Sequence, residues 1–236
     1  MFNTLVSHKY KFICFWNAKC ACGTLKTWFL NLHGVYEWEY SPHSEVTKYS
    51  PQINYDQLDE YPYKDYYKFV VVRNPWKRLV SYYKNKKIIM RHKNLDFPID
   101  KSRPIYSGDM SFAEMVNFLS YSDNNTFVRE AHVANQYDGL ENIDFDKVVK
   151  VENLHKDMLE VKNQLNLPID FDFNTNYHQP PSPISDSEKY VFDVKPLDFD
   201  KEDLPSYEYF YNNELIEKVK NSYLKDVEIF NYNFKD

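Results

Sequence analysis

Short apolar runs alternate along this chain with stretches whose apolar residues have helical spacing. Phe12–Trp16, Phe69–Val72 and Val148–Val151 have the length and composition of buried parallel strands. After the first run, the i, i+3, i+4, i+7 spacing of one helix face is followed by Leu25, Trp28, Phe29 and Leu32. We therefore predict a strand and then a helix, which ends near Gly34.

The second apolar run leads into an equally clear helix start. Asn74 suits the N-cap and Pro75 the first helical position, and the buried face is predicted to hold Trp76, Leu79, Val80 and Tyr83. Ser111–Glu114 has the form of a capping box and predicts a short helix that runs through Leu119.

Two further helices are predicted nearer the C-terminus. One has Leu154, Met158, Val161 and Leu165 on its face, and the final amphipathic helix has Ile216, Val219, Tyr223 and Val227. Residues 35–65, 84–110 and 166–185 lack a clean period and are interpreted as loops. Strands that alternate with helices favour an α/β layered fold with a parallel sheet.

Composition narrows the class of protein. A chain of 236 residues fits a single domain over residues 1–236, and its 43% hydrophobic and 18% aromatic content argues against disorder. The net charge of −6 gives no sign of nucleic-acid binding. Met1–Lys11 contains no apolar run of signal-peptide length, and no segment approaches the ~20 apolar residues of a membrane helix. We expect a soluble cytoplasmic protein without stable membrane insertion, unless an anchor has been removed.

Three cysteines stand close together in the chain, at Cys14, Cys20 and Cys22. An odd, clustered set is not a disulfide framework. No second Cys/His pair has the spacing of zinc ligands, so we predict no metal site and interpret these residues as small buried thiols in a tight loop.

The first strand-to-helix junction has the features of an anion cradle. Backbone amides of the loop Lys19–Thr24 can wrap an anion at the helix N-terminus, where the dipole is positive. Ala21 and Gly23 allow close backbone approach, Thr24 adds a hydroxyl donor and Lys19 a mobile charge. The Walker A pattern is absent, which disfavours an ordinary P-loop kinase or GTPase.

The second junction offers a second anion site. Arg73 ends a strand, where α/β folds place their ligands, and its guanidinium fork suits a phosphate. Ser81 lies two turns into the next helix and can face the same anion if the two helices pack together. Arg78 is interpreted as a structural salt-bridge residue. Two such junctions suggest a ligand with phosphates at both ends.

These two segments resemble the donor-binding motifs of sulfotransferases that use 3′-phosphoadenosine 5′-phosphosulfate (PAPS), most closely the Golgi-type carbohydrate sulfotransferases. Val72–Tyr83 is similar over nearly its whole length to the 3′-phosphate motif. The 5′-phosphosulfate motif departs at Ala18, where the family usually has Pro, and at Gly23, where it often has Ser or Thr. Weaker likenesses cover Glu130–Tyr137, Asp144–Leu154 and the last helix. The resemblance implies a P-loop-like three-layer sandwich, with a central parallel sheet flanked by helices.

The resemblance also implies a reaction. The family transfers a sulfuryl group in line from PAPS to an acceptor, and the product is adenosine 3′,5′-bisphosphate. Lys19 would stabilise the leaving phosphate oxygen. The 5′-phosphosulfate would be held by the amides of Cys20, Ala21, Cys22, Gly23 and Thr24. Arg73 and Ser81 would hold the 3′-phosphate, and no metal is needed because lysine and helix dipoles can meet the charge.

A general base should deprotonate the acceptor hydroxyl, and the family uses His or Glu for this task. We favour His43, because it lies in a loop that can return to the site, although a solvated loop histidine is an equal alternative. The remaining candidates are Glu37, Glu39, Glu45 and His132, whereas His33 is expected at the far end of its helix. Lys26, one turn into the first helix, could add charge to the anion site, but we favour its interpretation as a solvated helix residue.

The acceptor is expected to be a hydroxyl of a carbohydrate-like molecule. A basic stretch contains Lys84, Lys86, Lys87, Arg91, His92 and Lys93. Most such runs are solvated faces, but this one could also receive an anionic acceptor. Two other functions stay open. One is a metal-dependent P-loop phosphotransferase, for which we find no convincing magnesium carboxylate. The other is a catalytically silent nucleotide-binding module.

Overall fold

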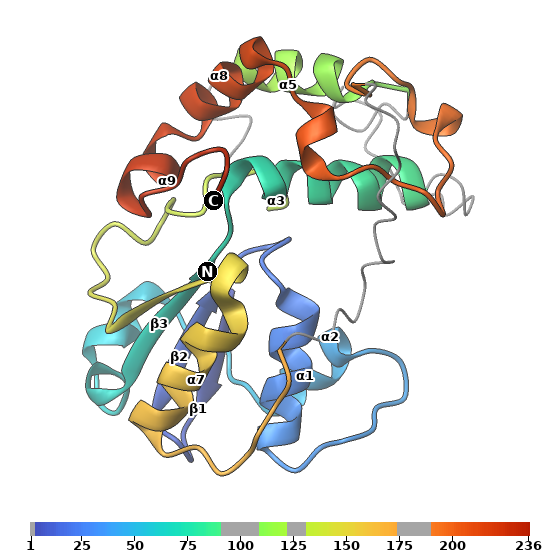
Figure 1. The fold of residues 1–236 in the computed structure, drawn as a ribbon. Helices are drawn as coiled ribbons and strands as arrows, with labels where there is room; N and C mark the ends of the chain where they lie inside the picture. Colours follow the sequence, from blue (N-terminus) through green and yellow to red (C-terminus); the bar gives the residue numbers. More distant parts are fainter. Residues whose placement is uncertain (1–2, 91–108, 122–130, 174–189) are drawn as a thin grey trace. The chain divides into compact units, whose positions relative to one another are not determined.

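A computed structural model describes residues 3–90, 109–121, 131–173 and 190–236 of the chain (Figure 1). The chain divides into two compact units. The first consists of Met1–Arg73 and Gln136–His178, and the second of Asn74–Asn135 and Gln179–Asp236. The prediction of a single domain over residues 1–236 stays a prediction.

The first unit contains a four-stranded sheet in the order β1-β2-β3-β4. The strands are β1 (Thr4–Ser7), β2 (Phe12–Trp16), β3 (Tyr67–Val72) and β4 (Lys147–Lys150). Strands β2, β3 and β4 are parallel, whereas β1 pairs antiparallel with β2. The three predicted strands are confirmed within two residues, and the α/β character is confirmed. The sheet is nevertheless mixed rather than wholly parallel, because the unpredicted β1 forms a short hairpin with β2.

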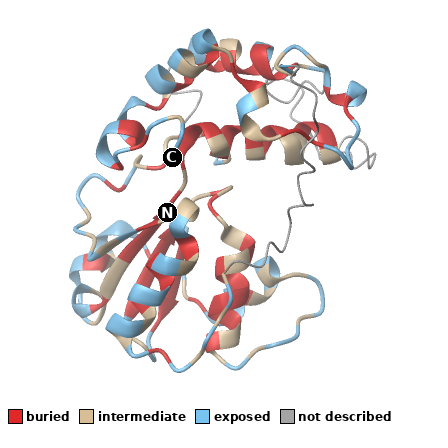
Figure 2. Cartoon of the chain, viewed as in Figure 1, coloured by how far each residue is buried: buried red, intermediate tan, exposed pale blue. Residues whose placement is uncertain are grey.

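Two helices of the first unit share one hydrophobic core with the sheet. They are α1 (Cys22–Leu32) and α7 (Leu154–Leu165), and the core they share with the sheet includes alternate strand residues such as Phe12, Phe69 and Val149. Figure 2 shows buried residues along the strands and on these helices. The predicted end of the first helix is confirmed, because Gly34 follows it with a φ of +79°.

The predicted loop over residues 35–65 is not wholly irregular. It contains α2 (Pro42–Glu45) and the 3₁₀ turns η1 (Val46–Lys48), η2 (Tyr55–Asp59) and η3 (Tyr63–Asp65). A further 3₁₀ turn, η6 (Val151–Asn153), leads into α7. Elements of three to five residues are too short to produce a helical period in the sequence, so the pattern could not reveal them.

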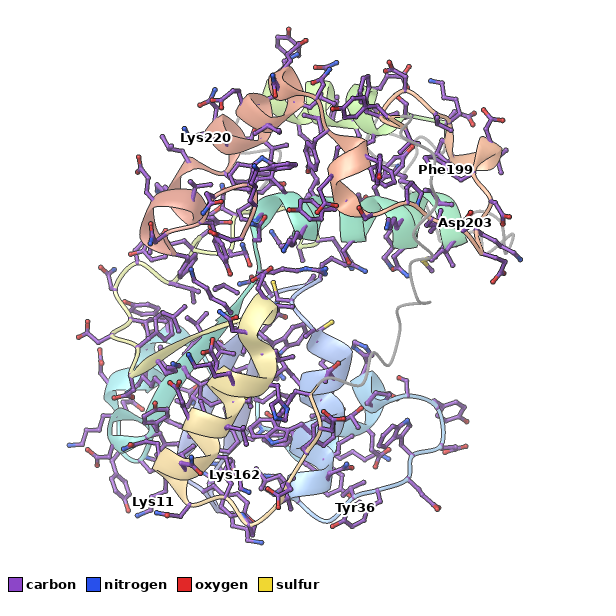
Figure 3. All side chains as sticks on the ribbon, viewed as in Figure 1. Lys11, Tyr36, Lys162, Phe199, Asp203 and Lys220 are labelled. Carbon is purple, nitrogen blue, oxygen red and sulfur yellow. The ribbon has the colours of Figure 1, made fainter. Side chains whose placement is uncertain are left out.

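The second unit, as far as it is described, is built from helices and turns. Its elements are α3 (Pro75–Tyr82), the π-helix η4 (Tyr83–Ile89), α5 (Phe112–Tyr121), η7 (Pro196–Asp198), η8 (Tyr207–Phe210), α8 (Asn213–Ser222) and α9 (Leu224–Ile229). Aromatic rings fill its interior: Phe199, labelled in Figure 3, stacks on Phe210 with ring centroids 5.8 Å apart, and Phe112 meets Tyr211 edge to face.

The helix starts predicted in this unit are confirmed. The Asn74 side chain accepts hydrogen bonds from the amides of Trp76 and Lys77. The Ser111 hydroxyl accepts from the Glu114 amide, and the Glu114 carboxylate accepts from the Ser111 amide, which completes the capping box.

Two other predictions for this unit need correction. The final helix is divided in two at Tyr223, whose φ of −118° and ψ of 31° are not helical. Residues 83–89 continue α3 as a π-helix instead of an irregular stretch, and residues 91–108 lie outside the described residues. Within the described ranges, no helix has the length and hydropathy needed to span a membrane.

Candidate functional site

The loop between β2 and α1 is held in an unusual backbone conformation. Lys19 and Ala21 have φ angles of 68° and 56°, in the left-handed region that L-residues other than glycine seldom adopt. The amide of Cys20 donates to the carbonyl of Asn17 at 3.1 Å, which tightens the turn. Backbone conformations of this kind cost about 1–3 kcal/mol each and are concentrated at ligand sites.

The N-terminus of α1 lacks a side-chain cap. Its N-cap residue is Ala21, which has no side-chain acceptor, and no acidic residue lies in its first turn. The amides of Cys22, Gly23 and Thr24 belong to that first turn, where a helix has no internal acceptors for its N–H groups. An anion is the natural partner for such a terminus because the dipole adds positive potential. By contrast, Asn74 already occupies the equivalent amides of α3.

Arg73 comes directly after β3, and it lies next to the loop that follows β2. Because β2 and β3 are parallel neighbours, their carboxyl ends lie at the same edge of the sheet. The Arg73 Nη1 donates to the carbonyl oxygen of Lys19 at 3.1 Å. The structure thus brings together two predicted site residues, one from each junction.

Gln136 fixes this arrangement from within the same unit. Its side-chain Nε2 donates to the Arg73 carbonyl and its Oε1 accepts from the Arg73 amide, both at 2.8 Å. The Cys20 Sγ donates to the same Oε1 at 3.0 Å, and the Asn17 side chain donates to the Gln136 carbonyl at 3.1 Å. Gln136 is only 1% exposed, although its partners Asn17 and Arg73 are partly exposed.

Ser81 and Arg78 lie on α3 in the second unit. Ser81 is partly buried. Arg78 is buried and donates to the carbonyls of Ala134 and Ala131, at 2.6 and 3.2 Å. These contacts with main-chain carbonyls give Arg78 a structural role, and the salt bridge predicted for it stays a prediction.

Lys26 is not a solvated helix residue, and the prediction for it was wrong. It is 6% exposed, and its Nζ lies 4.0 Å from the centroid of the Trp16 ring. Its long aliphatic stem allows burial beside the apolar face of α1. Burial lowers the pKa of Lys26, and the nearby Cys22 thiol has a smaller opposing effect.

His43 lies on α2 and meets Lys26. The His43 Nδ1 and the Lys26 Nζ are 2.8 Å apart, although the histidine itself remains exposed to solvent. The loop that carries His43 therefore returns to α1, one turn beyond the open N-terminus. Whether His43 is the general base stays a prediction.

The other candidate bases have different surroundings. His33 is at the far end of α1, as predicted, and burial lowers its pKa. Glu37 and Glu39 are exposed, and Glu45 forms an ion pair with Lys48 at 2.8 Å. His132 lies in the second unit, where its ring is 5.9 Å from that of Tyr82.

All three cysteines are free thiols. Cys14 and Cys20 are buried, but Cys14 lies in β2 rather than in the loop, and Cys22 is partly exposed at the start of α1. Burial raises the pKa of the Cys14 thiol, which therefore stays protonated at neutral pH. Among the described residues, no group of three or more His, Cys, Asp or Glu side chains is placed to hold a metal ion.

Sequence reasoning missed the roles of Gln136 and Lys26. An amide that binds the main chain 63 residues away produces no periodic signal. The available signal was the position of Gln136 in the segment that resembles the sulfotransferases. For Lys26, the helical period of α1 did not indicate that Trp16 and α2 would cover this lysine.

One of the comparisons with known proteins identifies a family. A sequence profile described as the sulfotransferase family matches residues 2–233, which is nearly the whole chain. Comparisons with curated proteins and with solved structures give no match. On the extent of the profile match, the chain belongs to the sulfotransferase family.

Proposed function

We propose that this protein transfers a sulfuryl group from PAPS to a hydroxyl of a carbohydrate-like acceptor. Membership of the sulfotransferase family supports sulfuryl transfer in general. The observation that carries the choice of donor is the pairing of Arg73 with the Lys19 loop beside the uncapped N-terminus of α1. We also propose that the fold is a P-loop-like three-layer sandwich and that the protein resembles the Golgi-type carbohydrate sulfotransferases.

The donor residues in this proposal fit a ligand with two anionic groups. The loop amides from Cys20 to Thr24 and the Thr24 hydroxyl would hold the 5′-phosphosulfate. Arg73 would hold the 3′-phosphate through its guanidinium fork. Ser81 joins Arg73 in this role on the strength of the motif resemblance alone.

The bound donor supplies an activated sulfuryl group whose leaving group is a phosphate. Lys19 would meet the charge that develops on the leaving phosphate oxygen, since its ammonium can approach from the loop. Arg73 helps to hold the Lys19 backbone in position. His43 would take the proton of the acceptor hydroxyl.

The acceptor is proposed to be a carbohydrate, and the basic residues after α3 support an anionic one. Lys84 and Lys86 on η4 are partly exposed, whereas Lys87 is buried. Arg91, His92 and Lys93 lie outside the described residues.

Calorimetric titration with adenosine 3′,5′-bisphosphate tests the donor site. The titration would be compared with ATP and AMP, without magnesium. We expect selective binding of the bisphosphate and a loss of at least about tenfold in affinity in Arg73→Ala and in Lys19→Ala, because each removes a charged contact worth about 1.5–3 kcal/mol. Lys220→Ala on the exposed face of α8 is the control and should bind normally.

The same titration, together with an assay of sulfuryl transfer from PAPS to glycans, separates the alternatives. Magnesium-dependent binding of ATP without binding of the bisphosphate would contradict the proposal and favour a phosphotransferase. Bisphosphate binding without sulfuryl transfer to any tested glycan would favour a silent nucleotide-binding module.

A further inference from the structure

Lys26 and His43 form a close contact between two groups that can each hold or release a proton. The Lys26 Nζ lies 2.8 Å from the His43 Nδ1, which is hydrogen-bond distance. Lys26 is enclosed, with its Nζ over the Trp16 ring, whereas His43 is exposed. The contact therefore joins a buried amine to an imidazole whose residue remains accessible to solvent.

The proton in this contact decides what His43 can do. An ammonium on Lys26 donates to Nδ1, so the neutral imidazole must carry its own proton on Nε2. In that form Nε2 has no lone pair with which to accept a proton. A neutral Lys26 amine instead accepts from Nδ1–H, and the lone pair is then on Nε2.

We propose that Lys26 controls the tautomer of His43, so that His43 can act as a base through Nε2 only while Lys26 is neutral. The inference rests on the proposed function, in which His43 deprotonates the acceptor. Lys26 acts through His43 and is a positioning residue.

The surroundings of Lys26 allow it to lose its proton. Burial lowers the pKa of Lys26 below its ordinary value, and among the described residues Cys22, one turn earlier on α1, is the group that opposes this shift. Of the elements packed against α1, α2 adds His43 and Glu45 and η1 adds Lys48. Glu45 is engaged by Lys48 at 2.8 Å.

The proton transfer is balanced within the pair. The acceptor O–H bond breaks, its proton moves to Nε2, and the acceptor oxygen forms the new bond to sulfur. The sulfur–oxygen bond to the donor phosphate breaks, and its electron pair leaves with that phosphate. His43 can pass its Nδ1 proton to Lys26, and the pair returns to its starting form by releasing one proton to solvent.

The test is a ¹⁵N NMR titration of the His43 ring between about pH 6 and pH 11, in the intact chain. We expect the wild-type ring, once neutral, to carry its proton on Nε2 and to move it to Nδ1 as Lys26 loses its proton. Lys26→Arg, which stays charged throughout this range, should keep the Nε2–H form. Lys26→Met should show the histidine titration without the second transition.

Activity provides a second readout, with PAPS as the donor and water as the acceptor. At a pH above the second transition of the wild type, where its Lys26 is neutral, Lys26→Arg should release the bisphosphate about 100-fold more slowly than wild type, which is the low end of a general-base contribution. Lys26→Met should be faster than Lys26→Arg, because without an ammonium at its Nδ1 the neutral His43 ring can keep the lone pair on Nε2. A structural role would predict the opposite order, because arginine better conserves the charge.

A His43 tautomer that does not change with pH in the wild type, or equal rates in the two variants, would overturn the inference. Binding of adenosine 3′,5′-bisphosphate confirms that each variant is folded. The NMR measurement needs no donor. If the wild-type protein fails to bind the bisphosphate, the proposed function is contradicted. The NMR titration still tests whether Lys26 controls the His43 tautomer.

Discussion

The side-chain amide of Gln136 pairs with the main chain of Arg73 as an adjacent strand would, with one hydrogen bond donated and one accepted, each 2.8 Å long. The same side chain meets the Cys20 thiol of the loop after β2. One buried glutamine therefore links the ends of two parallel strands at the edge where Lys19 and Arg73 meet. The geometry of this edge depends on a residue that carries no charge.

We predict that Gln136→Leu destabilises the protein by about 3 kcal/mol. The substitution removes the Gln136 hydrogen bonds to the amide and the carbonyl of Arg73, and the loss of a partner by a partly buried polar group costs about 1–3 kcal/mol. Urea unfolding measures the change. Gln136→Glu is the matched variant, because its carboxylate still accepts from the Arg73 amide but no longer donates to the carbonyl. Equal stability of Gln136→Leu and wild type would show that the pairing contributes nothing.

The N-cap of α3 provides a second prediction. Asn74 is fully buried, caps two amides and donates from Nδ2 to the Asn233 carbonyl at 2.7 Å. We expect Asn74→Ala to cost about 2 kcal/mol, as the sum of a lost cap at about 1 kcal/mol and a lost hydrogen bond to the exposed Asn233 at about 1 kcal/mol. Asn212→Ala at the start of α8 is the control, since its side chain caps only Leu215, and it should cost about 1 kcal/mol. A smaller loss at Asn74 than at Asn212 would contradict this account.

The sequence predicted the elements that have strong local signals. Asn74-Pro75 and the Ser111–Glu114 capping box each specify a helix start through side chains only two or three residues from their partners. The strands around Phe15 and Val71 are continuous apolar runs because both faces of the sheet are covered.

Features that depend on distant contacts could not be predicted in this way. The strand β1 has only two hydrophobic residues, Leu5 and Val6, and exists because it pairs with β2. The break at Tyr223 coincides with a tertiary hydrogen bond from its hydroxyl to the Val133 carbonyl, 90 residues away. The apolar period continues across this break, so the pattern indicated one helix. The same limit concealed the covering of Lys26 by Trp16.

Ala21 offers a test of backbone strain in the loop. Its φ of 56° is unfavourable for alanine and easy for glycine. We predict that Ala21→Gly raises stability by about 1 kcal/mol, which corresponds to roughly 2–4 °C in melting temperature for a chain of this size. Ala113→Gly, within α5, is the control and should lower stability by about 0.5–1 kcal/mol. A lower melting temperature for Ala21→Gly would show that the left-handed conformation is not a source of strain.

The buried tyrosines predict a loss of stability in alkali. Tyr223 donates its hydroxyl to the Val133 carbonyl at 2.7 Å, and burial raises its pKa well above the ordinary value of 10.0. Burial also raises the pKa of Tyr83 and of Tyr211. Above about pH 10 the unfolded chain loses these protons and the folded chain keeps them. The unfolded state then binds fewer protons, so stability falls as pH rises, by up to about 1.4 kcal/mol per pH unit for each tyrosine.

Tyr223→Phe should reveal this effect, because the difference in stability between the variant and the wild type should change sign as pH rises. At neutral pH the variant loses one hydrogen bond and should be about 1 kcal/mol less stable than wild type. Above pH 10 the wild type gives up about 1.4 kcal/mol per pH unit that the variant does not, so the two stabilities should become equal near about pH 11. Urea unfolding from about pH 8 to pH 11.5 measures both, with the exposed Tyr121→Phe as a control that leaves the slope unchanged. Parallel stability curves for Tyr223→Phe and wild type would mean that the Tyr223 hydroxyl ionises as readily in the folded chain as in the unfolded one. The burial of Tyr223 against Val133 would then contribute nothing to the loss of stability above pH 10.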